Sequence, residues 1–152
     1  MKTRRFYFLI SLITLLGMGQ GHLKASNNEE TITLKFVETS DVHGCYFPYD
    51  FIQNKQMRGG LARVSSYVKE EREVYGDNLI LMDNGDILQG QPVAYYYNYM
   101  DTTSVHVCAA MLNYMRYDVG NMGNHDVETG HAVYDRWVGQ CDFPILGANI
   151  VM

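Results

Sequence analysis

Four apolar segments of the chain have the pattern of β-strands. Residues 31–38 (TITLKFVE) are rich in β-branched side chains and alternate in polarity, whereas residues 78–82 (NLILM) form a nearly continuous apolar run. Such a run is typical of a strand that is covered on both faces of a parallel sheet. Residues 118–120 and 143–150 are the two remaining strand candidates. The pattern therefore predicts about four strands.

Three segments between these strands have helical patterns. Residues 61–75 carry apolar side chains near helical spacing, and Gly76 is well placed to end that helix. Residues 103–115 predict a second helix with Ser104 as its N-cap, and residues 129–139 predict a third. Strands alternate with helices along the chain, which predicts a layered α/β fold with right-handed crossovers. The intervening residues 45–60 are expected to form a loop.

The amino terminus has the pattern of an export signal. A basic start at residues 2–5 precedes an apolar run at residues 6–18, and small residues offer cleavage after Gly21 or Ala25. This order is typical of a secretory signal peptide, and the apolar run is short for a membrane span. We therefore expect residues 1–25 to be removed and the protein to be periplasmic or extracellular, with an uncleaved anchor as the alternative.

The charge of the chain limits its partners. An apolar content of 47% and a charged content of 19% are typical of a globular protein. The sequence contains 12 Lys and Arg against 17 Asp and Glu, and cleavage after Gly21 would change the formal charge from −5 to about −8. An acidic surface does not attract nucleic acid or anionic membranes, so we expect neither as a partner. A phosphate ligand would need local positive charge, which bound metal ions can supply.

The cysteines give no disulfide framework. Cys45, Cys108 and Cys141 are an odd number, and no C-x-x-C pair is present. One disulfide is possible in an exported protein, and three free thiols, with Cys108 on an apolar helix face, are at least as consistent with the sequence.

Polar clusters follow three of the predicted strands. Asp41 and His43 follow the first strand, Asp86 ends the sequence DNGD after the second, and Asn124 and His125 come after the third. Ligand sites of open α/β sheets gather at the carboxyl ends of strands, so these loops are expected to converge. Carboxylates and imidazoles bind divalent ions, a carboxylate can bridge two ions, and histidine can exchange a proton near neutral pH. Each cluster alone would be interpreted as an ordinary turn, but together they predict a metal site.

The order of these motifs resembles a known superfamily. D-x-H at residue 41, N-G-D at residue 86 and G-N-H at residue 124 are similar to the first three motifs of the calcineurin-like metallophosphoesterases. The segments GGLAR, DNGDILQG and DVGNMGNH are similar to its branch of 5′-nucleotidases and 2′,3′-cyclic-nucleotide 2′-phosphodiesterases. The resemblance covers residues 31–152. It implies a metallophosphoesterase-type fold of β-sheets flanked by helices, with residues 26–152 as the N-terminal portion of the catalytic domain, truncated after about four strands.

The resemblance also implies a role for each motif residue. Asp41 and His43 would bind one metal ion, Asp86 would bridge two ions, and Asn124 would bind the second ion. Asn124 and His125 would contact the substrate, and His125 would stabilise the transition state or protonate the leaving oxygen.

The partner of this histidine departs from the family pattern. The family often places an aspartate three residues after the histidine to orient its ring, and Glu128 occupies that position here. A longer carboxylate can do the same work. Asp126, directly after the histidine, is the competing partner.

The activity implied by the resemblance is hydrolysis of nucleotide phosphoesters, on 5′-monophosphates, 2′,3′-cyclic phosphates or both. Two divalent ions, Mn, Zn or Fe, would activate a hydroxide for attack on phosphorus. The family completes its site with a downstream G-H-x-H element and binds the base with a C-terminal domain, and neither lies within these 152 residues. We therefore expect this chain to be inactive on its own.

Two other functions stay open at this point. One is a non-catalytic interaction fragment that uses the acidic surface and the tyrosines at residues 95–99, with the metal motifs as relics. These tyrosines could also stack on a nucleobase or pack against another part of the protein. The other is a phosphoesterase of the same fold that acts on non-nucleotide phosphates. His106 and His131 fall on predicted helices, and we expect both to be structural.

Overall fold

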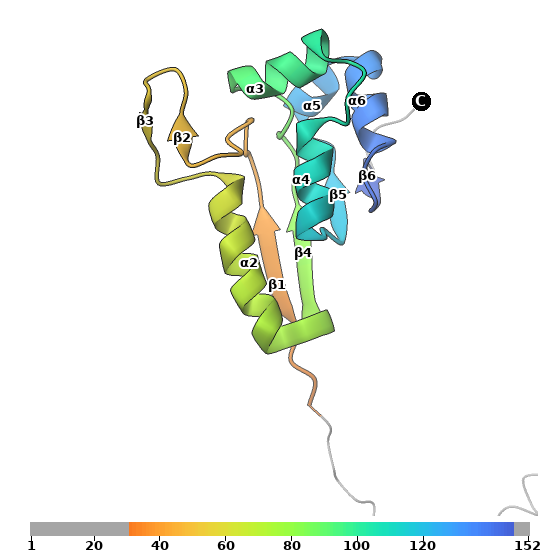
Figure 1. Ribbon diagram of the computed structural model, residues 1–152. Helices are drawn as coiled ribbons and strands as arrows, with labels where there is room; N and C mark the ends of the chain where they lie inside the picture. Colours follow the sequence, from red (N-terminus) through yellow and green to blue (C-terminus); the bar gives the residue numbers. More distant parts are fainter. Residues whose placement is uncertain (1–30, 148–152) are drawn as a thin grey trace, which may run out of the picture. The chain divides into compact units, whose positions relative to one another are not determined.

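A four-stranded parallel sheet organises the part of the chain that carries the motifs (Figure 1). The computed structural model describes residues 31–147. The chain divides into two units, Met1–Thr31 and Ile32–Met152, and all elements given below belong to the second. The strands in their order across the sheet are β1 (Lys35–Thr39), β4 (Leu79–Asp83), β5 (Val119–Asn121) and β6 (Ile145–Leu146). Because every neighbouring pair is parallel, the carboxyl ends of all four strands lie at one edge of the sheet.

Helices connect the strands, as the alternating pattern predicts. They are α2 (Leu61–Tyr75), α3 (Pro92–Tyr95), α4 (Val107–Met115), α5 (Asn124–Glu128) and α6 (His131–Val138), with a 3-10 turn η1 (Gly76–Asn78) and a π-helical turn η2 (Tyr96–Met100). The predicted helix over residues 61–75 is confirmed at both ends. Gly76 ends it with φ of 54°, a left-handed conformation that favours glycine. Tyr95, Tyr96 and Tyr99 are exposed on α3 and η2.

The hydrophobic core lies between one face of the sheet and the helices. Leu79 and Leu81 of β4 are buried on this face, where they join Leu61 of α2, Leu112 of α4 and Trp137 of α6 in one cluster. The neighbouring positions of β4 face the other way and are only half-buried. The described part of the chain therefore covers one face of β4 fully and the other only in part.

Several element boundaries differ from the prediction. β1 begins at Lys35, and residues 31–34 are not part of the strand. The predicted loop at 45–60 contains a two-stranded antiparallel hairpin, β2 (Tyr49–Asp50) and β3 (Lys55–Gln56). The predicted third helix begins two residues later than expected, as α6, and the short helix α5 before it was not predicted. The signal peptide and residues 148–150 of the last predicted strand lie outside the described residues.

The prediction of Ser104 as a helix N-cap is wrong. The Ser104 N–H donates to Oδ1 of Asp101 (3.0 Å), so it belongs to a turn that precedes the helix. His106 caps α4 instead, because its Nδ1 accepts the N–H of Cys108 (3.2 Å). Serine and aspartate close turns as readily as they cap helices, and the sequence alone does not separate the two uses.

His106 is structural, as predicted, and it lies in a fully buried hydrogen-bond chain. Its Nδ1 accepts a backbone N–H, so Nε2 carries the proton and donates to Oδ1 of Asn98 (2.9 Å). The Asn98 amide donates in turn to the carbonyl of Leu88 (2.7 Å), just beyond β4. Burial, together with the charge of Arg136, lowers the pKa of His106 from 6.5 to about 4.

The three cysteines are free thiols in the structure, with Cys108 buried on α4. Within residues 31–147, no helix has the length and apolar character needed to cross a bilayer.

We expect His106 to make the fold sensitive to acid. Its folded-state pKa lies below its unfolded value, so its contribution is complete above pH 6.5 and is lost as the pH falls towards 4. The loss is at most about 3 kcal/mol. Urea unfolding at pH 7, 5.5 and 4.5 should therefore show a steeper decline of the free energy of unfolding for the wild-type chain than for His106→Gln. Parallel declines would contradict this role.

Candidate metal centre

The loops after β1 and β4 continue the pairing of their strands. Beyond the last strand residues, the Asp41 N–H donates to the carbonyl of Gly85 (3.1 Å), and the His43 N–H donates to the carbonyl of Asp86 (2.9 Å). Two of the predicted polar clusters are thus fixed to each other through their backbones. This pairing explains why residues 45 positions apart in sequence meet in space.

Three predicted ligands come together at this edge of the sheet. Asp41, His43 and Asp86 each offer one ligand atom, and these atoms all lie within 4.8 Å of one another. His43 Nε2 is 3.8 Å from Oδ1 of Asp41, whose side chain is largely exposed. Two carboxylates and an imidazole are donors that suit divalent ions such as Mn, Zn or Fe, so the chemistry of this set fits a metal ion.

The backbone at all three of these residues is left-handed. The φ angles are 53° for Asp41, 49° for His43 and 58° for Asp86. Few non-glycine residues adopt this conformation, although aspartate, asparagine and histidine do so more often than the others. Asn54 in the turn between β2 and β3 and Arg116 at the end of α4 share it, so the angle accompanies the cluster and does not by itself mark a functional site.

His125 joins this cluster from α5. Its backbone N–H donates to Oδ1 of Asp86 (2.8 Å), and its ring centroid lies 5.4 Å from that of His43. Its Nδ1 lies 2.8 Å from Oε2 of Glu128, on the next turn of the helix. The hydrogen bond between these side chains raises the pKa of His125 and lowers the pKa of Glu128. Of the two carboxylates considered as partners of this ring, the structure brings Glu128 to it.

Asn124 is the first residue of α5 and is exposed beside His125. The six residues of the predicted site therefore lie at the carboxyl edge of one sheet, on the loops after β1 and β4 and on α5, which follows β5. Their separate roles stay predictions.

Comparison with known proteins agrees with this geometry. No family model matches the chain. The trifunctional nucleotide phosphoesterase protein YfkN of Bacillus subtilis is 32% identical over 126 residues, which cover 78% of this chain and 8% of YfkN. The 2′,3′-cyclic-nucleotide 2′-phosphodiesterase/3′-nucleotidase of Haemophilus influenzae is 30% identical over 155 residues, which cover 99% of this chain and 23% of the enzyme.

The crystal structure of calcineurin-like phosphoesterase YfkN superposes with a TM-score of 0.67 at 32% identity, over 74% of this chain and 36% of that one. Homologues and structural neighbours of this chain are calcineurin-like phosphoesterases, which it matches over part of their length. A putative 5′-nucleotidase from Staphylococcus aureus superposes with a TM-score of 0.68 at 33% identity, over 76% of this chain and 22% of that one. The chain spans less than a quarter of the length of the two curated relatives given above.

Two glycines allow the loop after β4 and the loop after β5 to come into contact. Gly85 has φ of 93°, and a Cβ there would lie 2.4 Å from the backbone nitrogen of Gly123. A Cβ on Gly123 would in turn lie 2.2 Å from Oδ1 of Asp86. Any side chain at Gly123 would therefore displace a candidate metal ligand.

The sequence analysis missed two buried carboxylates of the site. Asp83 is 4% exposed and accepts the hydroxyl of Thr39 (2.6 Å) and the N–H of Gly85 (3.0 Å). Burial raises its pKa from 3.8 to about 6. Asp126, considered only as a partner of His125, is instead fully buried and accepts backbone N–H groups. An acidic residue three positions after the N-cap of a helix often accepts the N-cap N–H. Asp126 stands three positions after Gly123, and this spacing was the signal in the sequence that could have revealed its role.

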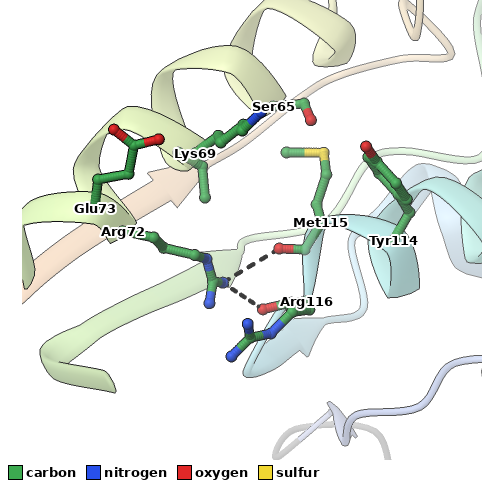
Figure 2. Close-up of a pocket in the computed structure, with 8 residues that line it drawn as sticks. Ser65, Lys69, Arg72, Glu73, Tyr114, Met115 and Arg116 are labelled. Carbon is green, nitrogen blue, oxygen red and sulfur yellow. Dashed lines mark hydrogen bonds between the residues drawn. The ribbon is translucent and has the colours of Figure 1, made fainter. Parts of the chain in front are cut away.

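A separate pocket of about 410 Å³ between α2 and α4 does not involve the metal centre (Figure 2). Arg72 donates there to the carbonyls of Met115 (3.2 Å) and Arg116 (2.7 Å), which are the last carbonyls of α4. A cation at this position stabilises the end of a helix. None of the residues that line this pocket is a candidate ligand, so it does not bear on the chemistry.

We expect Gly123→Ala to weaken metal binding, because its methyl group would displace Asp86. Calorimetric titration with Mn²⁺ should show a loss of affinity of about 10-fold or more. Gly59→Ala is the matched control, since a Cβ on Gly59 meets no atom within 4 Å. Equal affinities of the two variants would contradict the close packing of the loops.

We expect Asp83 and His106 to have opposite effects on how the free energy of unfolding changes with pH. Because the folded-state pKa of Asp83 is raised, its stabilising contribution is complete below pH 3.8 and is lost as the pH rises through about 6. In chelator-treated samples, the free energy of unfolding of Asp83→Asn minus that of the wild type should increase by about 3 kcal/mol from pH 4 to pH 7. Because both proteins contain His106, its contribution drops out of this difference between the free energies of unfolding. A constant difference would show that Asp83 has an ordinary pKa.

Proposed function

We propose that this protein hydrolyses nucleotide phosphoesters, as a 5′-nucleotidase, a 2′,3′-cyclic-nucleotide phosphodiesterase or both. The observation that carries the proposal is the cluster of Asp41, His43 and Asp86 beside the ring of His125. The names of the relatives support the substrate class, because both curated proteins described above are nucleotide phosphoesterases. Small nucleotides rather than nucleic acids are consistent with the acidic composition of the chain.

The ligand roles are those that the family resemblance implies. Asp41 and His43 would hold one divalent ion, Asn124 would contribute to a second, and Asp86 would be shared by both. Two such ions would polarise the phosphoryl oxygens. They would also lower the pKa of a bound water towards about 7, so that hydroxide is available at neutral pH. The relative positions of Asp41, His43 and Asp86 are set by backbone hydrogen bonds between the segments that follow β1 and β4.

His125 supplies charge and a proton next to the ions. The carboxylate of Glu128 holds Nδ1, which leaves Nε2 for the substrate, where it contacts a phosphoryl oxygen or the leaving oxygen. In the metal-free protein the hydrogen bond to Glu128 raises the pKa of His125. Glu128 is longer than the aspartate that is usual at this position in the family, and its observed contact with Nδ1 supports its use as the orienting carboxylate.

Export is part of the proposal and rests on the basic and apolar pattern of residues 2–18. A periplasmic or extracellular location would give the protein access to nucleotides outside the cytoplasm.

The function is tested on the complete gene product with Mn²⁺. It should release phosphate from 5′-AMP, open 2′,3′-cyclic AMP, or both, in preference to glycerol phosphate. His125→Ala should lower the rate by about 100-fold or more, because general acid catalysis contributes at least that much. Preference for glycerol phosphate would instead favour a phosphoesterase for non-nucleotide substrates.

The 152-residue chain by itself should be far less active. Among the described residues, the family resemblance assigns only Asp86 and Asn124 to the second ion, so we expect this chain to bind one ion well and the second weakly. Its rate should match that of its own His125→Ala variant. Clear turnover above that control would contradict the proposal that this chain holds only part of the site.

A further inference from the structure

Asp126 lies fully buried between the loop after β4 and the start of α5. Its Oδ1 accepts the N–H groups of Ile87 (2.9 Å) and Leu88 (2.8 Å), and its Oδ2 accepts those of Asp86 (2.8 Å) and Gly123 (3.0 Å). No lysine, arginine or histidine in residues 31–147 forms an ion pair with it. A buried carboxylate without a cation is tolerated only when hydrogen bonds satisfy it, and here four backbone donors do so.

Three of these donors come from consecutive residues. The N–H groups of Asp86, Ile87 and Leu88 all converge on the one carboxylate, which requires the chain to turn sharply as it leaves β4. Asp86 makes that turn with φ of 58°. Ile87 and Leu88 are fully buried, so water could not replace the carboxylate as their acceptor. Loss of the carboxylate would leave these buried N–H groups without an acceptor and would destabilise the turn at Asp86.

The side chain of Asp86 is also bonded to α5, because its Oδ1 accepts the N–H of His125. The backbone N–H of Asp86 donates to the carboxylate of Asp126, which follows His125 in the chain. Consecutive residues of α5 thus fix both the backbone and the carboxylate of Asp86. A third restraint comes from the first loop, where the His43 N–H donates to the Asp86 carbonyl. Rotation of the Asp86 side chain would break its bond to the His125 N–H, and a movement of its backbone would break the bonds to Asp126 and His43.

Asp126 is also excluded from the other role that its position in the sequence suggests. Both of its oxygens are used by backbone donors, and the ring of His125 is bonded to Glu128. Asp126 could accept a hydrogen bond from the His125 ring only by breaking its bonds to the backbone of the loop after β4.

We propose that Asp126 is a positioning residue of the metal centre, which sets the affinity of the site for its ion by holding Asp86 in the binding conformation. It does so without contacting the ion or the substrate. The inference rests on the proposed function only in taking Asp86 as a metal ligand.

The first test compares Mn²⁺ binding to the wild-type chain, Asp126→Asn and Leu112→Ala by calorimetry, at a temperature where circular dichroism shows all three to be folded. The asparagine keeps the shape but turns an NH₂ group towards backbone donors. We expect its affinity to fall by about 10- to 100-fold, the range found for groups that orient metal ligands. Leu112→Ala removes a fully buried core side chain on α4, and we expect its affinity to stay within a few fold of wild type.

A purely structural role of Asp126 would give a different result. Unchanged affinity of Asp126→Asn, or an equal loss in Leu112→Ala, would overturn the inference.

The second test needs no metal and separates this inference from the proposed function. Amide hydrogen exchange of the metal-free chains should show faster exchange in Asp126→Asn at His43 and His125, which bond to Asp86, but not at Leu81 in the core strand. Exchange at His43 and His125 as slow as in wild type would overturn the inference even if Mn²⁺ binding were lost. Conversely, faster exchange with no Mn²⁺ binding by the wild-type chain would support Asp126 as the residue that positions Asp86 and would overturn the metal centre.

Discussion

Backbone hydrogen bonds between the segments that follow β1 and β4 set the geometry of everything at this edge of the sheet. The two strands pair in register from Lys35 and Leu79 to Thr39 and Asp83, and their pairing continues into the loops. A shift of register by one residue would send the alternating side chains of either strand to the opposite face and would separate Asp41 from Asp86. The buried alternation of β4 against the helices fixes that register, so the hydrophobic core and the polar cluster are specified by the same pairing.

The third loop is attached in a different way. β5 is short, and the loop after it meets the β4 loop through a contact between glycines and through the carboxylate of Asp126. These contacts are polar and steric rather than hydrophobic, and they tolerate little displacement. Leu112 of α4 and Trp137 of α6 belong to the buried apolar core, which is formed separately from these contacts. The position of the third loop therefore depends on a few polar and steric contacts in addition to the hydrophobic core.

Much of this arrangement could be predicted from local pattern. The helix over residues 61–75 has a clear apolar period and a glycine at its end, and the order of strands with polar residues at their carboxyl ends indicated where Asp41, His43 and Asp86 would meet. Features that depend on contacts distant in sequence could not be predicted. Asp126 and Asp83 look like ordinary turn residues until the tertiary fold buries them, and Ser104 has the residue type of a cap but is used in a turn. The hairpin at residues 49–56 pairs only two residues on each side, too few to leave a pattern.

The left-handed backbone at Asp41, His43 and Asp86 sets metal binding against the stability of the metal-free chain. Glycine relieves the steric conflict at a positive φ, whereas aspartate and histidine adopt it more often than most other residues. Glycine at any of the three positions would therefore relax the backbone, while the candidate ion-binding set would lose one of its three donors.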